Sequence, residues 1–190
     1  MKFKLIFLFC LQTVLFSLFS CNLETFGEPY YEVRVESVVS KDTLRIRFVD
    51  YVPDGLRQEE SVRLIGVETP SLKSPENQYA TDEFYAVEAA DKIKSFCGKT
   101  FIIFFDKKLS YRRDAAGNLY AYLYNDSTSF DSINEQLIRE GYARYWNLGL
   151  ELENGKATRF EYAQEQAQFD GVGMWQNDIF FNRKLGCFLL

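Results

Sequence analysis

The chain has 190 residues, of which 47% are hydrophobic and 26% are charged, a composition typical of one globular domain with short appendages. It contains no histidine, which excludes Ser-His-Asp triads, Cys-His pairs and His-based metal motifs, so acid-base chemistry would fall to carboxylates, Lys, Tyr or a metal-bound water. The formal net charge of -5 argues against a protein that coats nucleic acid, but it leaves room for a small cationic cleft.

The first twenty residues have the pattern of a targeting signal. Two lysines precede a mostly apolar run over residues 5–20, which is shorter than the ~20 apolar residues of a membrane-spanning helix. The segment Leu18-Phe19-Ser20-Cys21 resembles a relaxed bacterial lipobox, whose cysteine is lipidated. The sequence therefore predicts a signal peptide over 1–20, a lipidated Cys21 with a tether over 21–29, and anchoring to a membrane of the cell envelope. Ordinary secretion is the alternative.

Loss of this signal would change both the charge and the cysteine count. The remaining chain carries 20 basic and 27 acidic residues, a formal net charge of -7. Besides Cys21 it retains Cys97 and Cys187, which could form a disulfide outside the cytoplasm. Two buried free thiols are the alternative.

Hydrophobic periodicity predicts the secondary structure of residues 30–176. Apolar residues alternate with polar ones in the first two expected strands, and the expected helices carry small or apolar residues on one face. The expected strands are 33–36, 44–48, 62–65, 101–105 and 119–124, and the expected helices are 81–97 with Thr81 as N-cap, 131–140 and 157–169. Five strands with one inserted and two appended helices predict an α+β fold, a five-stranded Greek-key β-barrel of the OB type. The tail over 177–190 is expected to pack on the domain or on a partner.

Four segments in chain order then carry a family resemblance. They are Asp42-Thr43, the run from Arg63 to Pro70, Asp114 with Gly117 and Ala121, and the run from Asp131 to Ala143, followed by Ala163, Ala167, Gly171, Gly173 and Trp175. Together they resemble the thermonuclease family, the staphylococcal-nuclease-like domains. The resemblance implies a calcium-dependent phosphodiesterase for DNA or RNA, in which carboxylates hold the ion, a Glu activates water and two arginines neutralise the developing charge.

Part of this site is present in the chain. The resemblance assigns Asp42, Glu68 and the backbone carbonyl of Thr69 to calcium, and Arg63 to phosphate. Glu68 stands where the family has an Asp, so its carboxylate is one methylene further from the backbone. The alternative is an ion cluster with a structural role only, in which Asp42 and Glu68 pair with Arg63 or Lys41.

At other positions the chain lacks the residues that the family uses for metal binding and catalysis. Ser40 and Lys41 replace an Asp and the turn Gly, Ser71 stands in place of the water-activating Glu, and Asn118 stands in place of the second Arg. A serine cannot act as a base without a partner, and an amide carries no charge. The sequence therefore predicts a degenerate site in a domain that retains a phosphate-, nucleic-acid- or partner-binding role.

Nearby charges leave an active calcium-dependent nuclease as the alternative. Glu76 could replace the base, and Arg113, or Arg112 beside it, could replace the second arginine. Solvated loop charge is the simpler interpretation of these residues. The alternating Tyr120, Tyr122 and Tyr124 could stack nucleobases, although tyrosines at this spacing more often cover a helix or face solvent.

Overall fold

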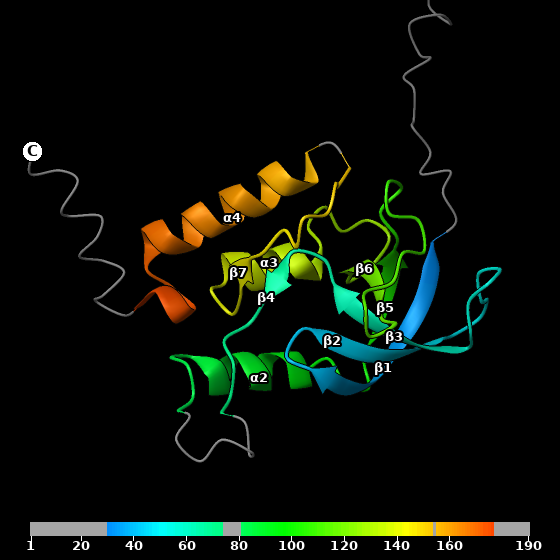
Figure 1. Cartoon of the computed structure of the whole chain (residues 1–190), viewed down its shortest axis with the longest axis horizontal. Helices are drawn as coiled ribbons and strands as arrows, with labels where there is room; N and C mark the ends of the chain where they lie inside the picture. Colours follow the sequence, from blue (N-terminus) through cyan, green and yellow to red (C-terminus); the bar gives the residue numbers. More distant parts are fainter. Residues whose placement is uncertain (1–29, 74–80, 154, 177–190) are drawn as a thin grey trace, which may run out of the picture.

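The structure is a computed structural model that describes residues 30–73, 81–153 and 155–176. Five strands form a closed barrel: β1 (Tyr31–Ser40), β2 (Thr43–Phe48), β3 (Glu59–Leu64), β5 (Thr100–Phe104) and β6 (Leu119–Tyr124). Their order is β1-β2-β3-β6-β5, and β1 closes the barrel against β5 (Figure 1). The β3–β6 pair is parallel and the other pairs are antiparallel. The predicted α+β fold with a five-stranded barrel is confirmed.

Three α-helices surround the barrel, one inserted and two appended as predicted. They are α2 (Ala86–Lys94), α3 (Ile133–Arg139) and α4 (Lys156–Asp170). α3 lies against β6, α4 packs on α3, and α2 lies on the side of α3 away from α4 in Figure 1, where Lys92 is paired with Glu140 at 2.6 Å. Among the described residues, no helix is long and apolar enough to cross a membrane.

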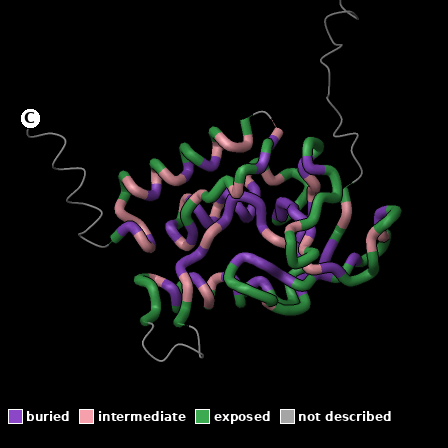
Figure 2. The backbone as a smooth tube through the Cα atoms, in the orientation of Figure 1, coloured by how far each residue is buried: buried purple, intermediate pink, exposed green. Residues whose placement is uncertain are grey.

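The strand β6 is buried on both faces, and this decides the role of its tyrosines. All six of its residues are buried, because the barrel interior covers one face and the helices cover the other (Figure 2). Tyr122 is 2% exposed and lies with its ring centroid 6.1 Å from that of Phe160 in α4. All three tyrosines of β6 are at most 8% exposed, so the idea of an exposed base-stacking face is wrong.

Two local features differ from the sequence prediction. The helix expected from Thr81 begins five residues later, because Tyr85 adopts a left-handed conformation with φ of 68° and no side chain caps the helix. A two-stranded sheet of β4 (Val67–Glu68) and β7 (Arg144–Tyr145) and a 3-10 helix, η1 (Gly173–Gln176), were not predicted. Elements of two to four residues are too short to show a hydrophobic period.

Several predictions concern residues outside the described ranges. These include the signal peptide over 1–20, lipidated Cys21 with its tether, Glu76, Cys187 and the tail over 177–190. Cys97 is exposed, so the alternative of two buried thiols is wrong for this residue, and its pairing with Cys187 stays a prediction. The 30–176 domain boundaries also stay a prediction.

A buried amide joins the barrel to α3. Asn134 is fully buried; its Oδ1 accepts a hydrogen bond from the backbone N–H of Leu123, 3.1 Å away. Its Nδ2 donates to the carbonyls of Ile65, at 2.9 Å, and Ala121, at 3.2 Å. Because Ile65 directly follows β3, one side chain holds together β6, α3 and the connection that leads to the candidate site.

Replacement of Asn134 by alanine should destabilise the domain by about 3 kcal/mol, because buried backbone groups lose their partners. Urea unfolding measures this loss. The matched control is the exposed Asn125→Ala, which should stay within about 0.5 kcal/mol of the wild type. A loss below about 1 kcal/mol for Asn134→Ala would show that the amide does not hold these elements together.

Candidate functional site

The candidate site forms where the β1–β2 turn meets the end of β3. Thr43 pairs with Arg63 across β2 and β3, and the backbone N–H of Leu64 donates to the carbonyl of Asp42 at 2.9 Å. The hydroxyl of Thr69 donates to the carbonyl of Lys41 at 2.9 Å, which fixes the turn against the segment after β4. The sequence-predicted residues Asp42, Arg63 and Thr69 are thereby brought together.

Arg63 lies at the centre of the site between two carboxylates. Its Nη2 is 3.0 Å from Oδ2 of Asp42, and its Nη1 is 3.7 Å from Oδ2 of Asp114. Asp42 also accepts hydrogen bonds from the hydroxyls of Ser40, at 3.1 Å, and Thr43, at 3.0 Å. The Nε–H of Arg63 is buried and has no hydrogen-bond acceptor in the described part of the chain. A buried donor without a partner is costly, so the other contacts of Arg63 must offset this cost.

Asn118 supports Asp114 and does not supply a charge. Its Nδ2 donates to Asp114 Oδ2 at 3.0 Å, and its backbone N–H donates to Asp114 Oδ1 at 2.8 Å. Burial raises the pKa of the Asp114 carboxyl, but these bonds, the Ala116 N–H and the charge of Arg63 outweigh burial and lower it. Asp114 is therefore held as a carboxylate that faces Arg63.

Glu68 is paired with two cations. Its Oε2 accepts from Nε of Arg144 at 2.7 Å, and its Oε1 lies 3.5 Å from Nζ of Lys41. The same ammonium donates to the hydroxyl of Ser71 at 3.2 Å. Burial raises the pKa of Glu68, but the hydrogen bond and charge of Arg144 and the charge of Lys41 outweigh it, so the pKa is lowered. β7 positions Arg144, because Arg144 is paired with Glu68 in the β4–β7 sheet.

The carboxylates of the site are already paired with cations. Asp42, Glu68 and Asp114 carry three negative charges, which are matched by the three cations Arg63, Lys41 and Arg144. Calcium needs several oxygen ligands with net negative charge, whereas here the side-chain oxygens already accept from cations. Among the described residues, no group of three acidic or cysteine side chains could hold a metal ion. The structural ion cluster expected as the alternative is present, and the calcium roles of Asp42, Glu68 and Thr69 stay predictions.

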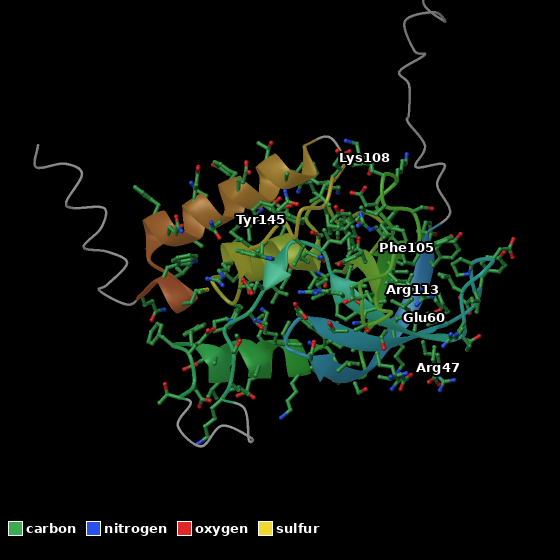
Figure 3. The ribbon with its side chains drawn as sticks, in the orientation of Figure 1. Arg47, Glu60, Phe105, Lys108, Arg113 and Tyr145 are labelled. Carbon is green, nitrogen blue, oxygen red and sulfur yellow. The ribbon has the colours of Figure 1, made fainter. Side chains whose placement is uncertain are left out.

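The expected substitute residues lie elsewhere or outside the described chain. Arg113 donates through Nη1 and Nη2 to both carboxylate oxygens of Glu60, each at 2.8 Å, as Figure 3 shows for the labelled pair. The Glu60 side chain is only 3% exposed, and burial raises its pKa, but the hydrogen bond and charge of Arg113 outweigh burial and lower it. Arg112 is exposed. The proposed substitution by Arg113 stays a prediction, and its guanidinium is occupied by a structural ion pair.

Sequence reasoning assigned no site role to Asp114, Arg144 or Glu83. Glu83 accepts a hydrogen bond through Oε2 from the backbone N–H of Ser71 at 2.7 Å, and its own N–H donates to the Ser71 carbonyl at 3.0 Å. It lines a hollow of about 240 Å³ together with Glu68 and Arg144. Because twelve residues separate Glu83 from Ser71, no local spacing signals this contact.

Fold and site together define an OB-type barrel with an arginine-centred polar site at the β1–β2 turn. The chain belongs to the family described as Staphylococcal nuclease homologue, whose model matches residues 61–177, more than half of the chain. Asp42 lies before the matched stretch, but the pairing of β2 with β3 places it in the same barrel.

A relative in Methanocaldococcus jannaschii, the uncharacterized protein MJ1439, is 32% identical over 129 residues. The similarity covers 60% of this chain and 60% of that protein. The chain therefore matches less than two thirds of the relative's length.

The pairing of Glu68 with Arg144 predicts a pH-dependent effect. Because the folded-state pKa of Glu68 is lowered, this carboxylate stabilises the fold above its ordinary pKa of 4.5, and the contribution is lost as pH falls through the folded value. Arg144→Met should make the loss of stability between about pH 5 and pH 3 shallower, while its effect at pH 7 stays below about 1 kcal/mol because the side chain of Arg144 is half exposed.

Urea unfolding over this pH range measures the effect. Replacement of the exposed Arg112 by methionine is the matched control and should leave the wild-type slope unchanged. Equal slopes for Arg144→Met and wild type would mean that Arg144 does not lower the pKa of Glu68.

Proposed function

We propose that this domain is a degenerate member of the nuclease family that binds phosphate groups of nucleic acid without hydrolysing them. The observation that carries the proposal is Arg63, whose side chain is one quarter exposed at the centre of the site, between the carboxylates of Asp42 and Asp114. An entering phosphate oxygen could accept from the guanidinium N–H groups that these two ion pairs do not use.

The same site is poorly equipped for hydrolysis. Ser71 accepts a hydrogen bond from Lys41, a donor that cannot remove a proton from the serine or from water. The amide of Asn118 is hydrogen-bonded to Asp114, and it carries no positive charge that could stabilise the negative charge developing on the phosphate during hydrolysis. A general base and a cationic stabiliser each contribute about 10²-fold or more to the rate, so loss of both is severe.

Lys41 supports binding that needs no metal. Its side chain is 37% exposed, and its ammonium bridges Glu68 and Ser71. In the family, calcium supplies positive charge opposite the phosphate; here the chain's own ammonium would supply it. Lys41 and Arg144 are both exposed enough to turn from Glu68 toward a phosphate oxygen.

The test is fluorescence anisotropy of a labelled single-stranded oligonucleotide with the full-length chain, in millimolar calcium and in chelator. We expect equal affinity in both buffers and an intact oligonucleotide on a denaturing gel. Lys41→Ala should weaken binding about three- to tenfold. It should also make the plot of log affinity against log salt concentration less steep, by the amount expected for about one phosphate contact. The matched control is Lys94→Ala, an exposed lysine of α2.

Two outcomes would overturn the proposal. One is the absence of binding at low salt by the folded chain, which removes the nucleic-acid role. The other is cleavage that disappears both with chelator and with Arg63→Ala, which shows an active calcium-dependent nuclease.

The position of Glu83 favours that active nuclease as a second candidate function. Its carboxylate is hydrogen-bonded to the residue that stands in the place of the family's base, and it shares a hollow with Glu68 and Arg144. If the chain cleaves, Glu83→Gln should reduce the rate about 10²-fold, as expected for loss of a general base. Glu76→Gln tests the other expected base in the same assay.

We also propose that the domain is carried to the cell envelope and anchored there through Cys21. The basic start, the apolar run and the LFSC segment support this, and secretion without an anchor is the alternative. Cys21→Ala in a bacterial host should move the protein from the membrane fraction to the soluble fraction and abolish labelling by radioactive palmitate. Cys97→Ala is the matched control, and its labelling should equal that of the wild type. Equal labelling of wild type and Cys21→Ala would refute the lipid anchor.

A further inference from the structure

A second cavity lies on a different part of the barrel. It has a volume of about 460 Å³ and lies between the ends of β5 and β6, the loop over residues 125–130 and the first turn of α4. None of the residues of the candidate phosphate site lines it. This volume is within the range of cavities that hold small ligands, ~300–1,000 Å³.

Five aromatic residues line the cavity: Phe104, Phe105, Tyr122, Tyr124 and Phe130. Phe104 and Tyr124 meet edge to face with ring centroids 5.1 Å apart, and Tyr122 lies beside them in β6. Phe130 stands at the rim with 81% of its surface exposed, and the Arg159 guanidinium carbon lies 4.2 Å from the centroid of its ring. A flat apolar body in the cavity would bury mainly the surface of Phe104 and Phe130 that is now in contact with solvent, because Tyr122 and Tyr124 are already buried.

Buried polar contacts fix the floor of the cavity. Asp106 is fully buried and accepts hydrogen bonds from the Tyr122 hydroxyl at 2.8 Å and from the backbone N–H of Glu153 at 3.0 Å. These bonds join β6 to the segment before α4. The cavity is therefore preformed, so a ligand would not need to order its walls.

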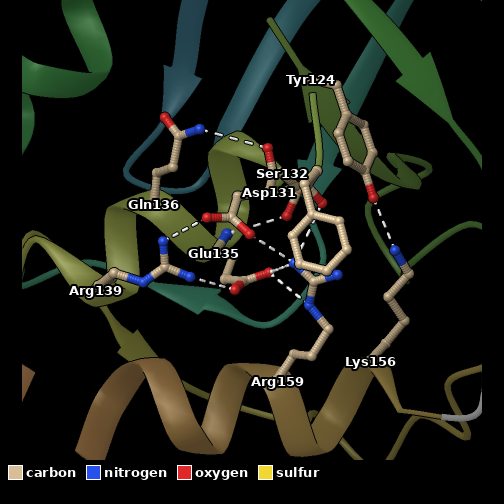
Figure 4. A network of polar contacts seen from close by, with 9 residues as sticks. Tyr124, Asp131, Ser132, Glu135, Gln136, Arg139, Lys156 and Arg159 are labelled. Carbon is tan, nitrogen blue, oxygen red and sulfur yellow. Dashed lines mark hydrogen bonds and ion pairs between the residues drawn. The ribbon is translucent and has the colours of Figure 1, made fainter. Parts of the chain in front are cut away.

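The cations of the cavity differ in how they are neutralised. Arg159 is paired with Asp131 at 2.7 Å and with Glu135 at 2.6 Å, as Figure 4 shows. Lys156 has no carboxylate partner within 4 Å in the described part of the chain. Its Nζ donates to the Tyr124 hydroxyl at 2.7 Å and lies 5.1 Å from the ring centroid of Tyr122.

Lys156 and Tyr124 together offer hydrogen-bond donors to an anion in the cavity. The Tyr124 hydroxyl accepts from Lys156 and retains its own proton as a donor, while the ammonium retains two further N–H groups. Two carboxylates, Asp126 and Glu153, also line the cavity. Lys107 lines the cavity as well, so three cations face two carboxylates, and this small positive excess suits a ligand with a single acid group.

We propose that this cavity binds a small organic monoanion with a flat aromatic body. The acid group lies at Lys156 Nζ and the Tyr124 hydroxyl, and the aromatic body lies against Phe104, Tyr122 and Phe130. The proposal is independent of nucleic-acid binding, because the two sites share no residue.

Isothermal titration calorimetry of the full-length chain with 1-naphthoate tests the proposal, with neutral 1-naphthylmethanol as the matched ligand. We expect submillimolar binding of 1-naphthoate. Lys156→Met, which keeps the length of the side chain, should weaken it about tenfold or more, while binding of the alcohol changes less than about twofold. Phe130→Ala, at an exposed position that the fold does not need, should weaken both ligands.

The controls separate this site from the candidate phosphate site. Lys94→Met and Lys41→Ala should bind 1-naphthoate like the wild type, and the far-ultraviolet circular dichroism of every variant should be unchanged. Equal affinity of the wild type and Lys156→Met for 1-naphthoate, or no heat with the wild type at millimolar ligand, would overturn the proposal. Neither result depends on whether the chain binds nucleic acid.

Discussion

The ion pairs of Arg63 are the interaction on which both the site and its surroundings depend. Arg63 is in β3, Asp42 is in the turn between β1 and β2, and Asp114 precedes β6, so one guanidinium joins three parts of the barrel. The side chains of Asp42 and Asp114 are only 6% and 9% exposed. Carboxylates so poorly hydrated need a charged partner, and removal of that partner is far more costly than loss of a surface pair. Arg63 is therefore a structural residue even where it also serves a ligand.

This constraint also bears on the third carboxylate of the cluster. With Arg63 fixed between two aspartates, the remaining carboxylate of the cluster, Glu68, needs its own counter-charge. Lys41 and Arg144 provide it from the β1–β2 turn and from β7. These ion pairs neutralise the carboxylates of Asp42, Glu68 and Asp114 with cations of the described chain.

The sequence predicted the barrel well because the apolar residues that alternate with polar ones along its strands are the residues that the barrel buries. Val33, Val35, Leu44 and Ile46 are all fully buried, as their period of two requires. The start of α2 was missed because Tyr85 turns the chain with a positive φ, which no residue pattern at Thr81 reveals. The structural ion cluster kept as an alternative included the pairing of Asp42 with Arg63 and of Glu68 with Lys41, and both pairs are present. The contacts of Arg144 with Glu68 and of Glu83 with Ser71 were not predicted, because they depend on how distant segments meet and the resemblance to the family names only the residues that the family uses.

The surroundings of Arg63 and of Lys156 differ, and the difference determines which kind of anion each residue can bind. Around Arg63 the carboxylates are held by the cations themselves, so an entering phosphate competes with internal ion pairs and gains only the difference between two similar interactions. Around Lys156 the ammonium is held by a phenol and by the faces of two rings, which are weaker partners than a carboxylate. An anion there displaces no ion pair within the described residues. We therefore expect a single small anion to bind more tightly at Lys156 than at Arg63. A nucleic acid can still bind at Arg63, because the weak contributions of many phosphate contacts add up along the polymer.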